Sequence, residues 1–211
     1  MAGREDSLPA TLLLCMNNYE IALVSAQKRC AGYNMAVLAA KPGVEETPAY
    51  LKTCFLGQEV CICKADASVT VDGKLANFGQ ALSVYDWLCD RKSDAAASGE
   101  FCPVSSLDRV YVSGKGLSMQ MPTLSKRIHD NPEQFRAGMA AIGAREIKMG
   151  DLGWQLNVFP DLPMGLKFYF ADDEFPPQLS LLWDRNSLQF VRYETLYYIA
   201  GCLHERLQRL F

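Results

Sequence analysis

The C-terminal third of the chain contains three short runs with large apolar residues at every second position, and this pattern limits the fold more than any other feature. The apolar residues are, in chain order, Trp154, Leu156, Val158, Leu166, Phe168, Phe170, Leu179, Leu181 and Trp183. Successive side chains of a strand point to opposite faces of a sheet, so each run predicts a strand with one buried face. Together the three runs predict an antiparallel meander.

The chain ends in a segment, residues 188–211, whose apolar residues recur at steps of three and four. They are Tyr193, Leu196, Ala200, Leu203, Leu207 and Leu210. This spacing places them on one face of an α-helix. We expect the long C-terminal helix to pack this apolar stripe on the apolar face of the meander.

The N-terminal half contains a second group of strands. Residues 50–57 and 59–65 predict a strand pair, and residues 68–71 predict a further strand that ends at an Asp-Gly turn. Residues 109–114 predict one more short strand.

Helical periodicity is found in three other segments, which are residues 11–30, 77–91 and 131–141. With the C-terminal helix this gives about four helices, and the separate groups of strands and helices favour the α+β class. Residues 1–10 are predicted to be a flexible tail and residues 92–100 a flexible connector. The remainder, residues 11–211, is expected to form a single domain.

The composition excludes some classes of function. The net charge is −3 and the basic residues are scattered, which argues against a nucleic-acid-binding surface. No run approaches the roughly 20 apolar residues that cross a membrane. The apolar run at residues 8–16 lacks the flanks of a signal peptide. We therefore expect a cytoplasmic protein whose eight cysteines are thiols.

The loop predicted between the second and third meander strands, residues 171–178, carries three consecutive carboxylates. Asp172, Asp173 and Glu174 precede Phe175 and two prolines. We expect the Phe175 ring to tuck under the loop and anchor it. The carboxylates are interpreted as a solvated turn, as a ligand contact, or as a hard-cation site in which Asp184 joins Asp172 and Glu174 across the hairpin.

Four other side chains are weaker candidates. Cys61 and Cys63 share one face of a predicted strand, where we expect them to pack as small apolar residues, with a soft-metal site as the alternative. His204 precedes Glu205 in the last helix and is a weak candidate for a metal ligand or half of an acid–base pair. His129 lies just before a predicted helix, and we expect both histidines to be boundary residues.

The chain also resembles a known family. The resemblance is carried by "AAIGAREIKMGD", by "VFPDLPMGLKFYFADDEFPPQLSLLWD" and by "YETLYYIAGCLHERL". These stretches are similar to the bacterial and archaeal family catalogued as domain of unknown function 3786, over residues 17–208. Members of that family are often fused to or associated with cysteine-ligated iron–sulfur modules, in some cases in corrinoid-dependent one-carbon metabolism of anaerobes. This chain lacks the four-cysteine motif of the fused members.

What the resemblance implies is an accessory protein of an anaerobic prokaryote that binds a small-molecule cofactor or an iron–sulfur or corrinoid protein. Together with the lack of an assembled catalytic set, it favours a non-catalytic binding module. The candidate ligand-binding residues are Asp172, Asp173, Glu174, Phe175, Asp184, Trp154 and Trp183, with Phe168 and Tyr193 as further apolar walls. A metal-dependent enzyme that uses the acidic loop and a structural subunit of a complex are the alternatives.

Overall fold

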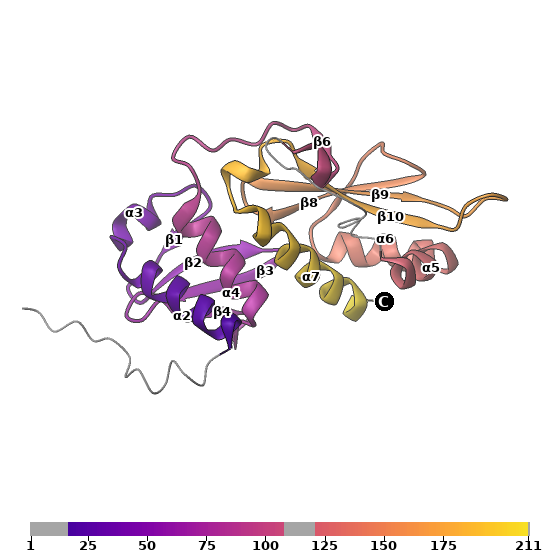
Figure 1. Cartoon of the computed structure of the whole chain (residues 1–211). Helices are drawn as coiled ribbons and strands as arrows, with labels where there is room; N and C mark the ends of the chain where they lie inside the picture. Colours follow the sequence, from indigo (N-terminus) through magenta and orange to yellow (C-terminus); the bar gives the residue numbers. More distant parts are fainter. Residues whose placement is uncertain (1–16, 108–120, 211) are drawn as a thin grey trace, which may run out of the picture.

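The computed structural model describes residues 17–107 and 121–210, which form two antiparallel sheets with helices beside them (Figure 1). The strands of the N-terminal sheet lie in chain order and are β1 (Glu45–Glu46), β2 (Tyr50–Phe55), β3 (Gln58–Cys63), β4 (Val69–Val71) and β5 (Lys74–Leu75). Those of the C-terminal sheet are β6 (Phe101–Cys102), β7 (Arg145–Glu146), β8 (Leu152–Phe159), β9 (Leu162–Tyr169) and β10 (Gln178–Asp184). Their spatial order is β6-β10-β9-β8-β7.

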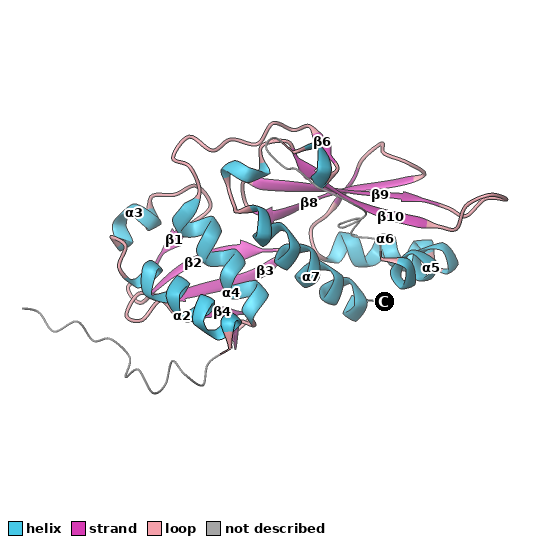
Figure 2. Cartoon of the chain, in the orientation of Figure 1, coloured by secondary structure: helices cyan, strands magenta, loops and turns pink. Residues whose placement is uncertain are grey.

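The helical elements were only partly predicted. They are α2 (Asn18–Ala31), α3 (Met35–Ala39), α4 (Phe78–Tyr85), the π-helical η1 (Asp86–Asp90), the 3₁₀ turn η2 (Val104–Ser106), α5 (Pro122–Asp130), α6 (Pro132–Ala141), the 3₁₀ turn η3 (Ser187–Gln189) and α7 (Tyr193–Leu210). The two short helices α3 and α5 add to those expected. Figure 2 shows α2, α4 and α7 grouped beside the N-terminal sheet, with α5 and α6 beneath the C-terminal one.

The N-terminal strand pair is confirmed. β2 and β3 pair antiparallel around a turn in which Leu56 and Gly57 both have positive φ. A side chain at Gly57 would lie 2.5 Å from the Ile142 carbonyl oxygen, so this position admits only glycine. The turn after β4, at Asp72 and Gly73, also has positive φ at both residues, as an Asp-Gly hairpin requires.

Helix α4 is buried on nearly every side because it lies between α2 and α7. Both α2 and α4 begin with capping boxes, formed by Asn17 with Glu20 and by Asn77 with Gln80. The Ser83 side chain is buried, and its hydroxyl donates to the Gly79 carbonyl at 2.7 Å. The segment predicted as one helix changes to a π-helix at η1.

The C-terminal meander is confirmed as β8, β9 and β10, and β7 and β6 extend it at either edge. Helix α6 begins where predicted, but Asn131 makes no side-chain cap because it directly joins α5 to α6. Helix α7 has α4 and α6 as its main neighbours. The apolar residues Leu196, Leu203 and Leu207 of its stripe are buried in the core that includes the apolar face of the meander. The predictions for residues 1–10, 11–16 and 109–114 lie outside the described residues.

A shared core joins the two sheets. The Leu56 N–H donates to the Val158 carbonyl at 2.8 Å, which ties the β2–β3 turn to the end of β8. The Phe159 ring at the end of β8 stacks on Trp87, with 4.6 Å between the ring centroids, and contacts Phe55, with 5.0 Å between the centroids. One hydrophobic cluster extends through both halves. The chain is thus a single α+β domain. Within the described residues, no helix has the length and apolar character that crossing a bilayer requires.

Candidate functional site

The loop between β9 and β10 projects beyond the end of the C-terminal sheet, on the side of α5 (Figure 1). Asp172 organises it. Its Oδ1 accepts hydrogen bonds from the N–H groups of Glu174 (2.9 Å) and Phe175 (2.7 Å), and its own N–H donates to the Phe175 carbonyl (3.1 Å). Asp173 and Glu174 are exposed. Asp172 therefore holds the loop in shape, as an Asx turn does.

These hydrogen bonds from Glu174 and Phe175 lower the pKa of Asp172 below its ordinary value of 3.8. A lowered folded-state pKa means that the carboxylate stabilises the loop above pH 3.8 and that this contribution is lost as the pH falls through the folded-state value. We expect Asp172→Ala to speed hydrogen exchange at the Glu174 and Phe175 amides several-fold without changing the global unfolding transition. Unchanged exchange at these amides would contradict the assignment, and Asp173→Ala is the matched control.

A cleft of about 610 Å³ opens between this loop and α5. Its lining is mainly apolar, and the residues are Met121, Pro122, Ser125, Lys126, His129, Asp130, Ala171, Phe175, Pro176, Pro177, Gln178 and Leu179. This volume is within the range of pockets that bind one small organic molecule.

Ser125 fixes α5 against the sheet. Its hydroxyl donates to the Met121 carbonyl at 2.9 Å and accepts from the Leu179 N–H at 3.0 Å, and the side chain is buried. One helix wall of the cleft is thereby tied to the first residues of β10.

His129 joins the same helix to the loop. Its Nδ1 accepts from the Ala171 N–H at 3.4 Å, and its ring meets the edge of Phe170 at 5.8 Å between centroids. Because Nδ1 accepts, the proton of the neutral imidazole is on Nε2, which is then a hydrogen-bond donor. His129 is half-buried in the last turn of α5, and it lies just ahead of α6 as expected.

Phe175 does not anchor the loop from below. Its side chain is 66% exposed, so the expected tucked ring is wrong. The ring instead contributes to the cleft wall together with Pro176 and Pro177. An exposed aromatic side chain at the edge of an apolar cleft is a common mark of a binding surface.

Asp184 lies at the opposite end of β10 from the loop, about 20 Å along the strand at the usual rise per residue. It is fully buried, and its carboxylate accepts from the Ser98 N–H (3.0 Å) and hydroxyl (3.1 Å), the Gly99 N–H (2.7 Å) and the Asn186 N–H (2.8 Å). The expectation that Asp184 joins Asp172 and Glu174 is therefore wrong. Asp184 instead fixes Ser98 and Gly99, which belong to the segment 92–100 that was expected to be a flexible connector.

The aromatic residues proposed as ligand walls are mostly part of the core. Trp154 and Trp183 are 2% and 1% exposed, and Phe168 is also buried. Trp154 packs edge-on against Phe135 of α6 at 4.7 Å. Tyr193 is half-buried and shares a hydroxyl hydrogen bond with Tyr197. The structure places none of these four in the lining of the cleft.

The cysteine and histidine candidates are not assembled into a metal site. Cys61 and Cys63 do share a face, but it is the open face of the N-terminal sheet, and Val60 and Ile62 fill the core instead. His204 is half-buried, and Glu205 is exposed and pairs with Arg209 at 3.6 Å. In residues 17–107 and 121–210, no three His, Cys, Asp or Glu side chains are grouped as metal ligands.

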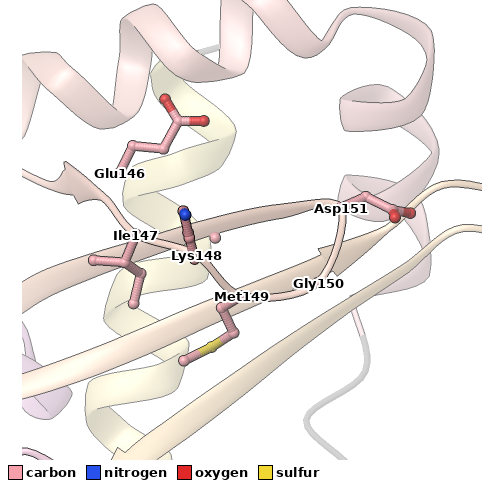
Figure 3. Close-up of a pocket in the computed structure, with 7 residues that line it drawn as sticks. Glu146, Ile147, Lys148, Met149, Gly150 and Asp151 are labelled. Atoms are coloured by element: carbon pink, nitrogen blue, oxygen red, sulfur yellow. The ribbon is translucent and has the colours of Figure 1, made fainter.

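A second hollow, of about 560 Å³, lies along residues 146–151 and Gly153 (Figure 3). Its two carboxylates, Glu146 and Asp151, lie at opposite ends of the segment in Figure 3. Asp151 accepts from the Phe170 N–H at 2.8 Å, and a side chain at Gly153 would lie 2.6 Å from the Met149 carbonyl oxygen. The polar groups here maintain the bend before β8 and do not converge on a common point.

Sequence reasoning missed an ionic cluster around the buried Asp86 of η1. Asp86 accepts a hydrogen bond from Thr195 and lies 3.2 Å from Arg29, while Arg29 and Arg192 both reach Asp90, at 3.0 and 2.5 Å. Burial raises the pKa of Asp86, although Thr195 and Arg192 oppose the shift. The cluster links α2, η1 and α7, and its charges are paired.

Sequence reasoning also missed α5, which carries Ser125, Lys126 and His129 of the cleft. A usable signal was present, because Pro122 stands at the start of the helix and Leu124 and Ile128 are four residues apart.

Comparison with known proteins places the chain in a family. A family described as a domain of unknown function (DUF3786) matches residues 34–206, a segment that includes both walls of the cleft. No curated protein and no solved structure matches the chain. The matched segment covers far more than half of the sequence, and it agrees with the resemblance seen in the sequence. The chain therefore belongs to the family described as domain of unknown function 3786.

Proposed function

We propose that this protein is a non-catalytic binding protein that takes a small cofactor-like molecule in the cleft between α5 and the β9–β10 loop. The observation that carries the proposal is the exposed Phe175 ring beside an apolar cleft whose two walls are fixed by Ser125 and His129. The buried hydrogen bonds of Ser125 hold the α5 wall, and the exposed one between Ala171 and His129 ties the loop to it, so the cleft is formed before any ligand enters. A preformed site loses less conformational entropy on binding.

The lining indicates the chemistry of the ligand. Phe175, Pro176 and Pro177 offer a flat apolar surface, which suits an aromatic or macrocyclic body. Lys126 supplies a positive charge, and the Nε2–H group of His129 supplies a hydrogen-bond donor. A ligand with an acidic group on its polar edge would therefore be favoured. Among the described residues of the lining, Asp130 is the only carboxylate, and it is the natural partner for a hydroxyl or amide on the same edge of the ligand.

The family resemblance supports the same class of ligand. Corrinoids and haems combine a flat macrocycle with acidic or amide side chains, and flavin nucleotides combine a flat ring with a phosphate. An accessory role beside an iron–sulfur or corrinoid protein is consistent with a site that holds such a molecule without an assembled catalytic set.

A pair of tryptophan reporters tests the proposal. The three native tryptophans are buried, so Phe175→Trp adds an exposed indole at the cleft, and Leu75→Trp adds one at an even more exposed position on β5. Titration with haem, flavin mononucleotide, a corrinoid and anilinonaphthalene sulfonate is expected to quench or shift the Phe175→Trp emission for at least one probe. The Leu75→Trp emission should stay unchanged.

A binding assay with alanine variants that lack the added tryptophan completes the test. Burial of a phenyl ring contributes about 1.5–3 kcal/mol to binding. Phe175→Ala should therefore lower the affinity for a probe that gave a response about tenfold or more, and Leu75→Ala should leave that affinity unchanged. Equal responses of the two reporters, or no response to any of the four probes, would contradict the proposal and favour a structural subunit.

A further inference from the structure

The β9–β10 loop is tied to one face of α5 at both of its ends. The Ala171 N–H, near the start of the loop, donates to His129 Nδ1 at 3.4 Å. The Leu179 N–H, just past the end of the loop, donates to the Ser125 hydroxyl at 3.0 Å. Ser125 and His129 are four residues apart in α5, so they lie on the same face of the helix, one turn from each other. The loop is therefore held against α5 at two neighbouring points.

The two attachments differ in chemistry and in burial. The hydrogen bond between Leu179 and Ser125 is buried, and a serine hydroxyl can accept a hydrogen bond whatever the pH. His129 is half-buried, and its hydrogen bond with Ala171 is exposed. An imidazole nitrogen accepts only while it carries no proton, and histidine is the residue type whose charge ordinarily changes between about pH 5 and 8. The second attachment therefore depends on the protonation state of His129.

Charged side chains from three segments lie near His129. Lys126 and Asp130 belong to α5 and line the cleft together with it. Asp172 is in the loop, and Asp151 is in the bend before β8, where it accepts from the first N–H after β9 at 2.8 Å. Aspartate and lysine side chains ordinarily keep their charges between about pH 5 and 8. Among these described groups, a change of charge in this range therefore falls on His129.

Protonation of His129 reverses the polarity of its contact with the loop. With a proton on each nitrogen the ring has only donors, so Nδ1–H and the Ala171 N–H face each other as two donors. We propose that His129 is a pH-sensitive latch: the neutral ring holds the first part of the β9–β10 loop against α5, and the protonated ring releases it. The hydrogen bond between Leu179 and Ser125 remains, so the released loop pivots about its Leu179 end.

The consequence of release falls on the cleft, and this step rests on the proposed function. Asp172 accepts from the Glu174 and Phe175 N–H groups within the loop, so the turn keeps its shape when Ala171 is released. Phe175 then moves away from α5 with the turn, and the cleft loses its aromatic wall. The affinity of the cleft for an uncharged apolar ligand should therefore fall as the pH falls. The latch itself needs no ligand.

Nuclear magnetic resonance of the ligand-free, full-length chain tests the latch. Between pH 8 and pH 5 the Ala171 amide should shift with the same midpoint as the His129 ring. Its hydrogen exchange, corrected for the intrinsic effect of pH, should become about two- to tenfold faster, as expected for the loss of one hydrogen bond. The Leu179 amide should keep its protection. An Ala171 amide that does not follow the ring, or whose corrected exchange is unchanged, would overturn the proposal.

Three variants identify the atom responsible. His129→Asn places an amide oxygen where Nδ1 lies and has no group that titrates, so Ala171 should stay protected throughout the pH range. His129→Gln places its amide beyond that point, so Ala171 should exchange fast throughout. His204→Asn is the matched control, because it removes the other histidine of the chain, on α7. A titration of Ala171 that persists in His129→Asn, or disappears in His204→Asn, would contradict the latch.

Binding of the uncharged dye N-phenyl-1-naphthylamine, followed by its fluorescence, separates the latch from the proposed function. The native chain should bind the dye about two- to tenfold more weakly at pH 5.5 than at pH 7.5, and His129→Asn should bind it equally at both. Equal affinity of the native chain at the two pH values would overturn the regulation of the cleft. If the Ala171 amide follows the ring but no dye binds at either pH, the latch stands and the cleft fails as a binding site. Dye binding by a chain whose Ala171 amide does not follow the ring would keep the cleft and overturn the latch.

Discussion

Replacement of Asp184 by alanine is expected to lower the free energy of unfolding by about 3–5 kcal/mol. The Asp184 carboxylate is fully buried and accepts from the Ser98 N–H and hydroxyl and from the N–H groups of Gly99 and Asn186. Its removal leaves these donors without an acceptor and frees the segment before β6 from the end of β10. Urea unfolding followed by far-ultraviolet circular dichroism measures the change.

Asp173→Ala is the control for Asp184→Ala, since Asp173 is exposed in the β9–β10 loop. Its effect should stay within about 0.5 kcal/mol, as at ordinary surface positions. A loss below about 1 kcal/mol for Asp184→Ala would show that the hydrogen bonds around it add little to stability, and the structural role assigned to Asp184 would be wrong.

Phe159→Ala is expected to have a comparably large effect, about 3–5 kcal/mol, because it opens a cavity where the two sheets meet. The Phe159 ring stacks on Trp87 and contacts Phe55, and Trp87 is itself fixed by its indole N–H, which donates to Asp161 at 2.9 Å. Loss of the ring removes contacts to both halves of the core together. The unfolding transition should shift as a whole and remain a single transition, as measured by calorimetry.

Phe175→Ala provides the contrast, because it removes the same side chain from an exposed position. It should change stability by less than about 0.5 kcal/mol. If Phe159→Ala instead produced two separate unfolding transitions, the two sheets would be independent units and the single-domain description would fail.

The regular strands were predictable because burial on one face leaves a period of two in the sequence. β8, β9 and β10 were found on that basis, and so was the β2–β3 pair. The same rule failed to choose the face of β3. Val60 and Ile62 alternate with Cys61 and Cys63, both sets are apolar in character, and only packing against the rest of the molecule places the larger pair inside.

The short helices were less accessible to sequence reasoning. Helix α3 contains little more than one turn, too few for a clear period of 3.6, and the signal for α5 is limited to Pro122 and to the spacing of Leu124 and Ile128. Since α5 forms one of the two walls of the cleft and was not predicted, the cleft was missed as well. Sequence reasoning singled out the β9–β10 loop for its charges, whereas the structure places Ala171 and residues 175–178 in the lining of the cleft and leaves the three consecutive carboxylates outside it.

The remaining features depend on contacts between residues far apart in the sequence. Asp184 meets Ser98 and Gly99 from a segment some 85 residues earlier. Asp86 of η1 likewise meets Arg29 of α2, 57 residues earlier in the sequence. Neither pairing has a local signature, so the sequence supplied the residues but not their partners.

The most direct test of the cleft as the binding site is a map of backbone amide shifts in a proton–nitrogen correlation spectrum during titration with anilinonaphthalene sulfonate. We expect saturable shifts concentrated at residues 121–130 and 171–179, and we expect these shifts to be lost in Phe175→Ala. Shifts centred on the open face around Cys61 and Leu75, or shifts in the cleft that persist unchanged in Phe175→Ala, would contradict this expectation.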